Sequence, residues 1–270
     1  MSKRLPLRYN ELMDHNGYID FHCHLDDPCY EKNRWSIIDQ CFSSGFKKLI
    51  TVADPYNEGS LERTAEILAY HPDIDCTIGA HPHQADQYSP EIERRIFGFR
   101  KRFKIMAIGE VGLDFHYNFS PPENQISTFK QQIALARDCS LPLVIHSRHA
   151  EKQVLEILAR ERFAQPVVFH CYTGDGDAAK EIVNRGYFVS FSGIITFKKA
   201  GELRRIVEET PLDRLFSETD SPYLAPEPNR GRINTPLAVI QVAEKIAEIK
   251  KTDLSVVLEH IARNFQGLKG

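Results

Sequence analysis

The feature that most constrains the fold of this 270-residue chain is a regular alternation of short apolar runs with longer amphipathic segments. Apolar runs of this length, bounded by polar residues, are typical of buried strands. We predict strands at residues 18–21, 48–52, 75–79, 105–108, 143–145, 166–169, 187–191 and 214–216. Strands that alternate strictly with helices are parallel and joined by right-handed crossovers. The pattern leaves two architectures open, a doubly wound open sheet and a closed barrel.

The helical segments carry recognisable start signals. Ser120 is predicted as an N-cap, with Pro121 as the first helical residue and Glu123 as the capping-box partner. This helix is expected to run to about Asp138. Another helix is predicted to begin after Thr235, which precedes a proline. No domain boundary is evident, and the length suits a single α/β barrel spanning 1–270, since such a barrel needs about 250 residues.

Composition and charge exclude several classes of protein. The 34 basic and 37 acidic residues give a net charge of −3, so the chain cannot coat DNA by bulk positive charge. No apolar run approaches the roughly 20 residues of a membrane span, and residues 1–15 lack the apolar stretch of a secretory signal. The six cysteines form no C-x-x-C pair and indicate reduced thiols, hence a cytoplasmic protein. Nothing in the sequence indicates an oligomeric state.

Side chains that can bind metals recur where the predicted strands stop. They are His22 and His24, His81 and His83, Glu110, His146, His170, and Glu218 with Asp220. In a parallel barrel all strand carboxyl ends lie on one face, where active sites are built. Residues far apart in the sequence are therefore expected to converge there.

The ligand types indicate one or two divalent metal ions. His22 and His24 lie on the same side of an extended strand, because side chains alternate, so both can reach one ion. Imidazole and carboxylate ligands suit Zn or Mn, and a carboxylate-rich pocket also admits Mg. We expect Glu110 to bridge two ions and His146 and His170 to complete the second. Asp220 is expected to bind the first ion and to orient or deprotonate its water, whose pKa a metal lowers to about 7.

Seven segments together resemble the TatD-type metal-dependent hydrolases. They are residues 18–26, 79–82, 109–114, 143–148, 170–174, 189–193 and 217–224, which follow one another in order over nearly the whole chain. The resemblance implies a TIM (β/α)8 barrel of the metallo-dependent, amidohydrolase-like type. The metal ligands it implies are His22, His24, Glu110, His146, His170 and Asp220.

The resemblance also implies an activity. Members are mostly described as Mg- or Mn-dependent DNases, including 3′ exonucleases, and some relatives hydrolyse D-aminoacyl-tRNA esters. One segment departs from the family pattern, because Thr235 stands where an Arg-Asn-Glu-Pro-like segment usually has its acid. This departure bears on substrate preference and leaves the expected ligands unchanged.

We therefore expect a deoxyribonuclease that cleaves phosphodiester bonds, with Asp220 and Glu110 as catalytic residues and DNA or an oligonucleotide as substrate. Candidates for phosphate binding are His81, Arg148, Arg230 and Arg232, since guanidinium groups match phosphate oxygens. Tyr172 and Tyr223 are candidates to stack on a base, and packing is their alternative role.

Two other functions remain open at this point. The first is a metal-dependent ester hydrolase such as a D-aminoacyl-tRNA deacylase. Related barrel amidases often bridge their metals with a carboxylated lysine from the fourth strand, whereas here that strand leads to Glu110, which favours the phosphodiesterase. The second is a barrel that only binds nucleotides or a partner, for which no metal would be needed.

Overall fold

The computed structural model describes residues 17–268, and these form a barrel of eight parallel strands whose order follows the chain. The strands are β1 (Tyr18–Cys23), β2 (Phe46–Ala53), β3 (Ile74–Ile78), β4 (Ile105–Asp114), β5 (Leu143–Arg148), β6 (Val167–Phe169), β7 (Phe188–Phe191) and β8 (Leu215–Ser217). The N-terminal segment 1–15, for which we predicted no secretory signal, lies outside the described residues.

The ring closes where the chain leaves β8 and meets β1. The backbone N–H of Asp220 donates to the carbonyl of His22 at 2.9 Å. The backbone N–H of His24 donates to the carbonyl of Ser221 at 2.7 Å. Parallel pairing continues through every other neighbouring pair, from β1–β2 to β7–β8. The predicted TIM barrel is confirmed, and the open doubly wound sheet is excluded.

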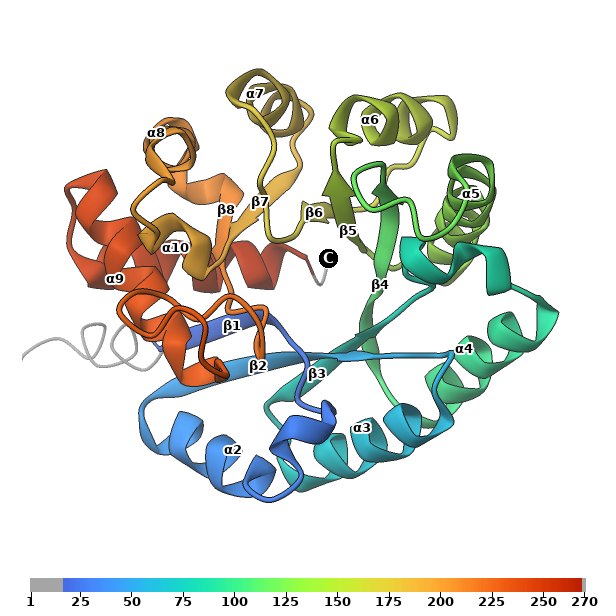
Figure 1. The fold of residues 1–270 in the computed structure, drawn as a ribbon, viewed down its shortest axis with the longest axis horizontal. Coiled ribbons are helices and arrows are strands. Elements are labelled where there is room, and N and C mark those ends of the chain that lie inside the picture. The colour runs from blue at the N-terminus through green and yellow to red at the C-terminus, as the bar shows by residue number, and fades with distance from the viewer. Residues whose placement is uncertain (1–16, 269–270) are drawn as a thin grey trace, which may run out of the picture.

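Helices surround the strands on the outside (Figure 1). They are α2 (Arg34–Ser43), α3 (Glu58–Tyr70), α4 (Pro90–Arg102), α5 (Pro122–Cys139), α6 (Glu151–Arg160), α7 (Gly176–Asn184), α8 (Gly201–Glu209), α9 (Val239–Lys250) and α10 (Leu254–Gly267). Within residues 17–268, no helix combines the length and the apolar character that crossing a membrane requires.

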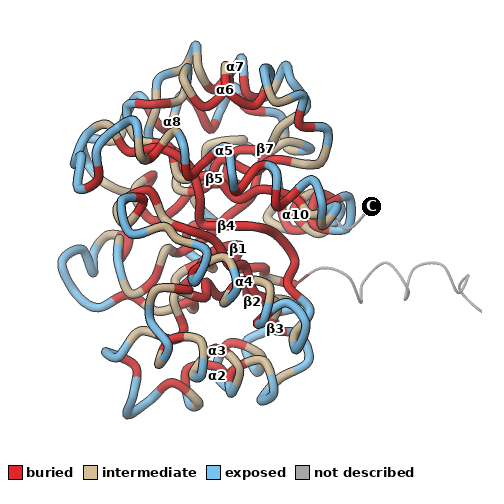
Figure 2. Tube along the Cα trace, turned by 90° about the vertical axis from the view of Figure 1, so that its right-hand side faces the viewer, coloured by how far each residue is buried: buried red, intermediate tan, exposed pale blue. Residues whose placement is uncertain are grey.

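The core follows the strands, and exposed residues follow the outer faces of the helices (Figure 2). All ten residues of β4 are buried, as expected for a parallel strand covered on both faces. Inside the barrel the rings of Phe21 and Phe216 stack with centroids 4.3 Å apart, which links β1 to β8. This packing makes the barrel a filled scaffold that presents side chains at its rim.

Each of the eight predicted runs overlaps a strand, but β4 is longer than predicted. It continues through Glu110 to Asp114, so Glu110 does not follow the strand as expected but lies within it. The pairing of β4 with β5 is irregular between Ile108 and Val111, where one extra residue enters β4. An irregularity of this kind re-aims a side chain, here the carboxylate of Glu110.

The predicted start of α5 is wrong by one residue. Pro121 is the N-cap, the helix begins at Pro122, and Ser120 makes no capping bond to it. The Ser120 hydroxyl instead contacts the carbonyl of His83 at 2.9 Å and Oδ1 of Asp86 at 2.7 Å. Ser120 therefore holds the short helical turn after β3 rather than the start of α5.

The helix predicted after Thr235 also begins differently. Residues Pro236–Ala238 form a 3-10 turn, and α9 follows it directly. Thr235 occupies the N-cap position of this turn, but its side chain makes no capping hydrogen bond.

Candidate metal centre

The predicted ligands converge at the carboxyl ends of the strands. His22, Glu110 and His146 lie in β1, β4 and β5, while His24, His170 and Asp220 lie just beyond β1, β6 and β8. All of them except the fully buried His22 line a cavity of about 550 Å³. Among the described residues it is lined by His24, His81, His83, Glu110, Tyr117, Phe119, His146, Ser147, Arg148, His170, Cys171, Thr173, Ile194, Asp220, Tyr223 and Leu224.

The two carboxylate oxygens of Glu110 face different histidines. Oε1 lies 2.6 Å from Nε2 of His170 and 2.8 Å from Nδ1 of His146. Oε2 lies 3.5 Å from Nε2 of His22, on the side of the first ligand group. Glu110 thus contacts His22 through one oxygen and His146 and His170 through the other, and it forms one potential ligand group with His22 and His170.

The first ligand group consists of His22, His24 and Asp220. Oδ1 of Asp220 lies 3.4 Å from Nε2 of His24 and 3.9 Å from Nε2 of His22. Asp220 adopts a left-handed backbone conformation with φ of 53°, which Asp tolerates better than most residues. Hydrogen bonds to Asp20 stabilise this turn. The carboxylate of buried Asp20 accepts the backbone N–H of Thr219 at 2.8 Å and its hydroxyl at 2.6 Å.

The buried histidines need a partner that the described residues do not supply. His22 is completely buried, and neither of its ring nitrogens has a hydrogen-bond partner among residues 17–268. Nδ1 of His170 makes no well-aligned hydrogen bond among these residues, and Oε1 of Glu218 lies 3.3 Å from it. Leaving such atoms unsatisfied costs about 1–3 kcal/mol each. Since the other groups present are carboxylates, a divalent cation fits this donor set in charge and in ligand chemistry.

The titratable groups have strongly shifted pKa values. Burial opposes ionisation of Glu110, but the charge of His170 and the hydrogen bonds from His146 and His170 outweigh it and hold the Glu110 pKa well below its usual value. Burial likewise opposes protonation of His170, and Glu110 and Glu218 raise its pKa well above normal. For His24, the contact with Asp220 overcomes burial and raises the pKa to about 9. These shifts show a site in which carboxylates favour positive charge.

His146 is held between two carboxylates. Its Nδ1 faces Glu110, and its Nε2 lies 3.0 Å from Oδ2 of Asp114. The same Oδ2 accepts a bond from Nε2 of His83 at 2.8 Å. Asp114 is fully buried, and burial opposes its ionisation, yet the bonds from His146, Tyr117 and His83 hold its pKa below the normal range.

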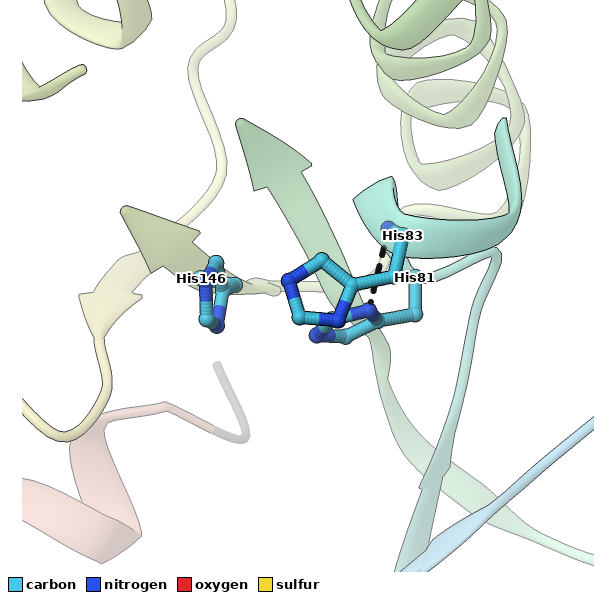
Figure 3. A group of neighbouring side chains, drawn as sticks. All are labelled: His81, His83 and His146. Atoms are coloured by element: carbon cyan, nitrogen blue, oxygen red, sulfur yellow. Dashed lines mark hydrogen bonds between the residues drawn. The ribbon is translucent and has the colours of Figure 1, made fainter. Parts of the chain in front are cut away.

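His81, His83 and His146 form a further cluster whose ring atoms lie close enough to hold an ion (Figure 3). The hydrogen bonds argue against that use. Nδ1 of His81 accepts a bond from the backbone N–H of His83 at 3.2 Å, which places the proton of a neutral ring on Nε2. Burial lowers the pKa of His81 to about 4, so the ring is neutral at pH 7. His81 therefore presents an N–H donor, 3.3 Å from Oε1 of Glu110.

Two carboxylates that we did not assign support the expected ligands. Asp114 contacts His146, and completely buried Glu218 lies 3.3 Å from Nδ1 of His170 while accepting the backbone N–H of Cys171 at 2.6 Å. Such outer carboxylates fix the orientation of metal-binding histidines. The sequence signal for Glu218 was its place directly after β8. Asp114 was marked only as the last residue of the family-like segment 109–114, and no predicted strand end pointed to it.

The candidate substrate-binding residues are placed unequally. His81 and Arg148 line the cavity, whereas Tyr172, Arg230 and Arg232 are not among its lining residues in the described part of the chain. Tyr172 is 2 % exposed, and its hydroxyl donates to the carbonyl of Asp175 at 2.6 Å, so it packs. Arg230 lies over the ring of Phe197 at 4.4 Å, and Arg232 is on the exposed loop that follows it.

An eight-stranded parallel barrel that gathers histidines, a glutamate and an aspartate at the carboxyl ends of its strands is typical of metal-dependent hydrolases. Residues 19–269 match the family described as TatD related DNase. The chain belongs to this TatD family.

Known proteins agree with the assignment. The chain is 35 % identical over 254 residues to the uncharacterized metal-dependent hydrolase YabD of Bacillus subtilis, covering 92 % of this chain and 98 % of YabD. It is 34 % identical over 255 residues to the uncharacterized metal-dependent hydrolase YcfH of Escherichia coli K12, covering 93 % and 94 % of the two chains. The crystal structure of YjjV, a TatD homologue of Escherichia coli K12, superposes with a TM-score of 0.85 at 25 % identity, covering 93 % of this chain and 97 % of YjjV.

Proposed function

We propose that this protein is a divalent-metal-dependent deoxyribonuclease that removes nucleotides from single-stranded DNA ends. The observation that carries the proposal is the placement of Glu110, whose two oxygens face separate ligand groups. Two ions held beside this carboxylate would suit in-line displacement at phosphorus, because both the attacking and the leaving oxygen need stabilisation. The family description, TatD related DNase, points to the same chemistry.

The residues divide into roles. Bound divalent ions supply Lewis-acid polarisation of a phosphoryl oxygen and activation of water. His22, His24 and Asp220 would hold one ion, His146 and His170 would hold a second, and Glu110 would serve as a ligand beside both groups. Burial opposes ionisation of Asp220, but the hydrogen bond from His24 lowers its pKa, so it is a carboxylate at pH 7 and can accept a proton.

Two further residues contact the phosphate in this proposal. The N–H of neutral His81 points at the metal site and donates to a phosphoryl oxygen. Arg148 lines the same cavity and offers its guanidinium to a neighbouring phosphate. The cavity of about 550 Å³ matches the size range of single small-ligand sites, which favours binding of one terminal nucleotide.

We also propose that the protein works in the cytoplasm. All six cysteines are free in the described chain, and three of them, Cys23, Cys41 and Cys76, are buried. Free thiols are typical of reducing compartments.

The proposal is tested with purified protein on three substrates, namely single-stranded DNA labelled at either end, single-stranded RNA, and D-aminoacyl-tRNA. We expect stepwise shortening of the DNA from one end in the presence of Mg or Mn, and no product from Asp220→Asn with the fold retained. Wild-type-like turnover by Asp220→Asn would remove its assigned role. Cleavage of the aminoacyl ester alone would replace the nuclease by the ester hydrolase.

A further inference from the structure

Two large aromatic rings stand exposed at the rim of the barrel between β4 and α5. The side chain of Tyr117 is 48 % exposed and that of Phe119 is 67 % exposed. Their rings are almost parallel, at 4°, with centroids 5.5 Å apart. Two aromatic rings exposed to solvent do not contribute the favourable free energy of burial. An exposed aromatic pair of this kind is typical of a ligand-binding surface.

The pair belongs to the metal cavity. Both rings line it, and the ring of His83 meets that of Phe119 edge-on at 4.8 Å and 90°. The guanidinium of Arg148 lies over the ring of Tyr117 at 4.9 Å. Arg148, Tyr117 and Phe119 therefore form a continuous π surface, which we call the aromatic rim.

The aromatic rim is tied to the ligand histidines through one carboxylate. Oδ1 of Asp114 accepts the backbone N–H groups of His116 and Tyr117 at 2.9 and 2.8 Å, while Oδ2 accepts His83 and His146. The backbone at Tyr117 is thus tied to the carboxylate that contacts His146. A ligand lying on the rim is held at a set distance from the metal centre.

We propose that the aromatic rim is a nucleobase-stacking site that holds a base next to the scissile phosphate. A nucleotide is the ligand that presents a flat π face and a phosphodiester within one repeat, matching the rings and the metal centre side by side. Base–aromatic stacking accepts every base, because each has a π face. The site would therefore recognise single-stranded nucleic acid with little sequence preference, and binding would not need the bulk positive charge that this chain lacks.

This inference rests on the proposed function, so its test measures binding separately from cleavage. The probe is a phosphorothioate-linked dinucleotide that carries the fluorescent base 2-aminopurine and resists hydrolysis. Wild-type protein with Mg is expected to quench the fluorescence as the base stacks. Phe119→Ala and Tyr117→Ala should each weaken binding by about tenfold, and Phe119→Trp should restore it. Tyr70→Ala, which removes an exposed ring outside the cavity, serves as the matched control and should bind like wild type.

Parallel hydrolysis of single-stranded DNA separates the two claims. If wild-type protein cleaves the DNA while the KM values of Phe119→Ala, Tyr117→Ala and Tyr70→Ala are equal, the proposed stacking site is overturned. The same result supports the proposed nuclease activity. Ring-dependent quenching without cleavage by wild type supports the stacking site and overturns the nuclease. Failure of wild-type protein to quench the probe overturns the stacking site.

Discussion

Nε2 of His146 lies 3.0 Å from Oδ2 of Asp114, while Nδ1 of the same ring lies 2.8 Å from Oε1 of Glu110. Because the buried carboxylate of Asp114 only accepts, it keeps the proton on Nε2. In the metal-free protein Nδ1 donates to Glu110, and its lone pair would become available to a metal ion once that proton leaves. One hydrogen bond thereby decides which ring nitrogen of His146 is the ligand.

Asp114→Asn should reverse this assignment. The backbone N–H groups of His116 and Tyr117 already donate to Oδ1, so the amide oxygen stays there and the NH₂ group faces Nε2 of His146. The ring must then carry its proton on Nδ1, toward the metal. We expect metal affinity to fall by roughly 10- to 100-fold, as measured by equilibrium titration with Mn. Asp86→Asn, an exposed carboxylate in the turn after β3, is the control; equal affinities for the two variants would refute the assignment.

Tyr172→Phe should affect stability and leave catalysis unchanged. The Tyr172 hydroxyl donates to the carbonyl of Asp175, the N-cap residue of α7, and the ring is buried away from the cavity lining. Removal of this hydrogen bond should lower the free energy of unfolding by about 1 kcal/mol. Denaturant unfolding measures the loss, and kcat and KM on single-stranded DNA should equal those of wild type. A rise in KM would instead support the base-stacking role first considered for Tyr172.

The metal-free protein should lose stability as the pH rises. The pKa of His24 is about 9 in the folded protein and near 6.5 when unfolded. When the pKa of a group is higher in the folded than in the unfolded protein, its protonation stabilises the folded state. This stabilisation is complete at a pH below the unfolded pKa and is lost as the pH rises through the folded pKa. The Tm of protein kept in EDTA should therefore fall between about pH 6.5 and 9. The fall should be smaller in His24→Gln, and an identical pH profile for that variant and wild type would contradict the assignment to His24.

Loading the protein with metal should remove the pH dependence of Tm that His24 causes. Histidine binds a metal ion as the neutral ring, so the ion takes the place of the proton and metal affinity rises with pH. We expect the apparent affinity for Mn to increase between pH 6 and 8.5. A flat affinity over this interval would show that the histidines carry no proton in the metal-free site.

Arg148 and Arg232 should respond differently to truncation. Arg148 lines the cavity, whereas Arg232 lies on the exposed loop and does not line it. We expect Arg148→Ala to raise KM for single-stranded DNA by about tenfold, and Arg232→Ala to change it by less than twofold, because an exposed charge is screened by solvent. A larger rise in KM for Arg232→Ala than for Arg148→Ala would instead support substrate binding by the loop after β8.

The sequence predicted the eight parallel strands because they are buried on both faces and appear as apolar runs, and the family resemblance indicated the barrel. It missed the second half of β4, since Gly109–Asp114 is rich in glycine and acid and resembles a loop. There Gly112 has φ of 139°, and a Cβ at this position would lie 2.1 Å from the carbonyl oxygen of His146. The glycine is required by the close approach of β4 to β5, which no hydrophobic pattern reveals.

The candidate ligands were predictable for a different reason. Histidine and carboxylate residues at strand ends must meet on one face of a parallel barrel, whatever the details of the loops. Asp114 and Glu218 act through His146 and His170, and contacts of this kind have no fixed spacing in the sequence. Whether the side chains of Tyr172, Arg230 and Arg232 point into the cavity depends on the conformation of their loops. Loops have no periodic sequence pattern from which this could be predicted.

The measurement that tests the central claim most directly is release of nucleotides from single-stranded DNA by metal-stripped protein reloaded with Mg, Mn or Zn, beside Glu110→Ala. Since both ligand groups share Glu110, we predict metal-dependent release by wild type and a loss of at least about 100-fold in the variant, which corresponds to roughly 2.7 kcal/mol of transition-state stabilisation. No release by wild-type protein that has been shown to bind metal, or equal release by Glu110→Ala, would contradict the account.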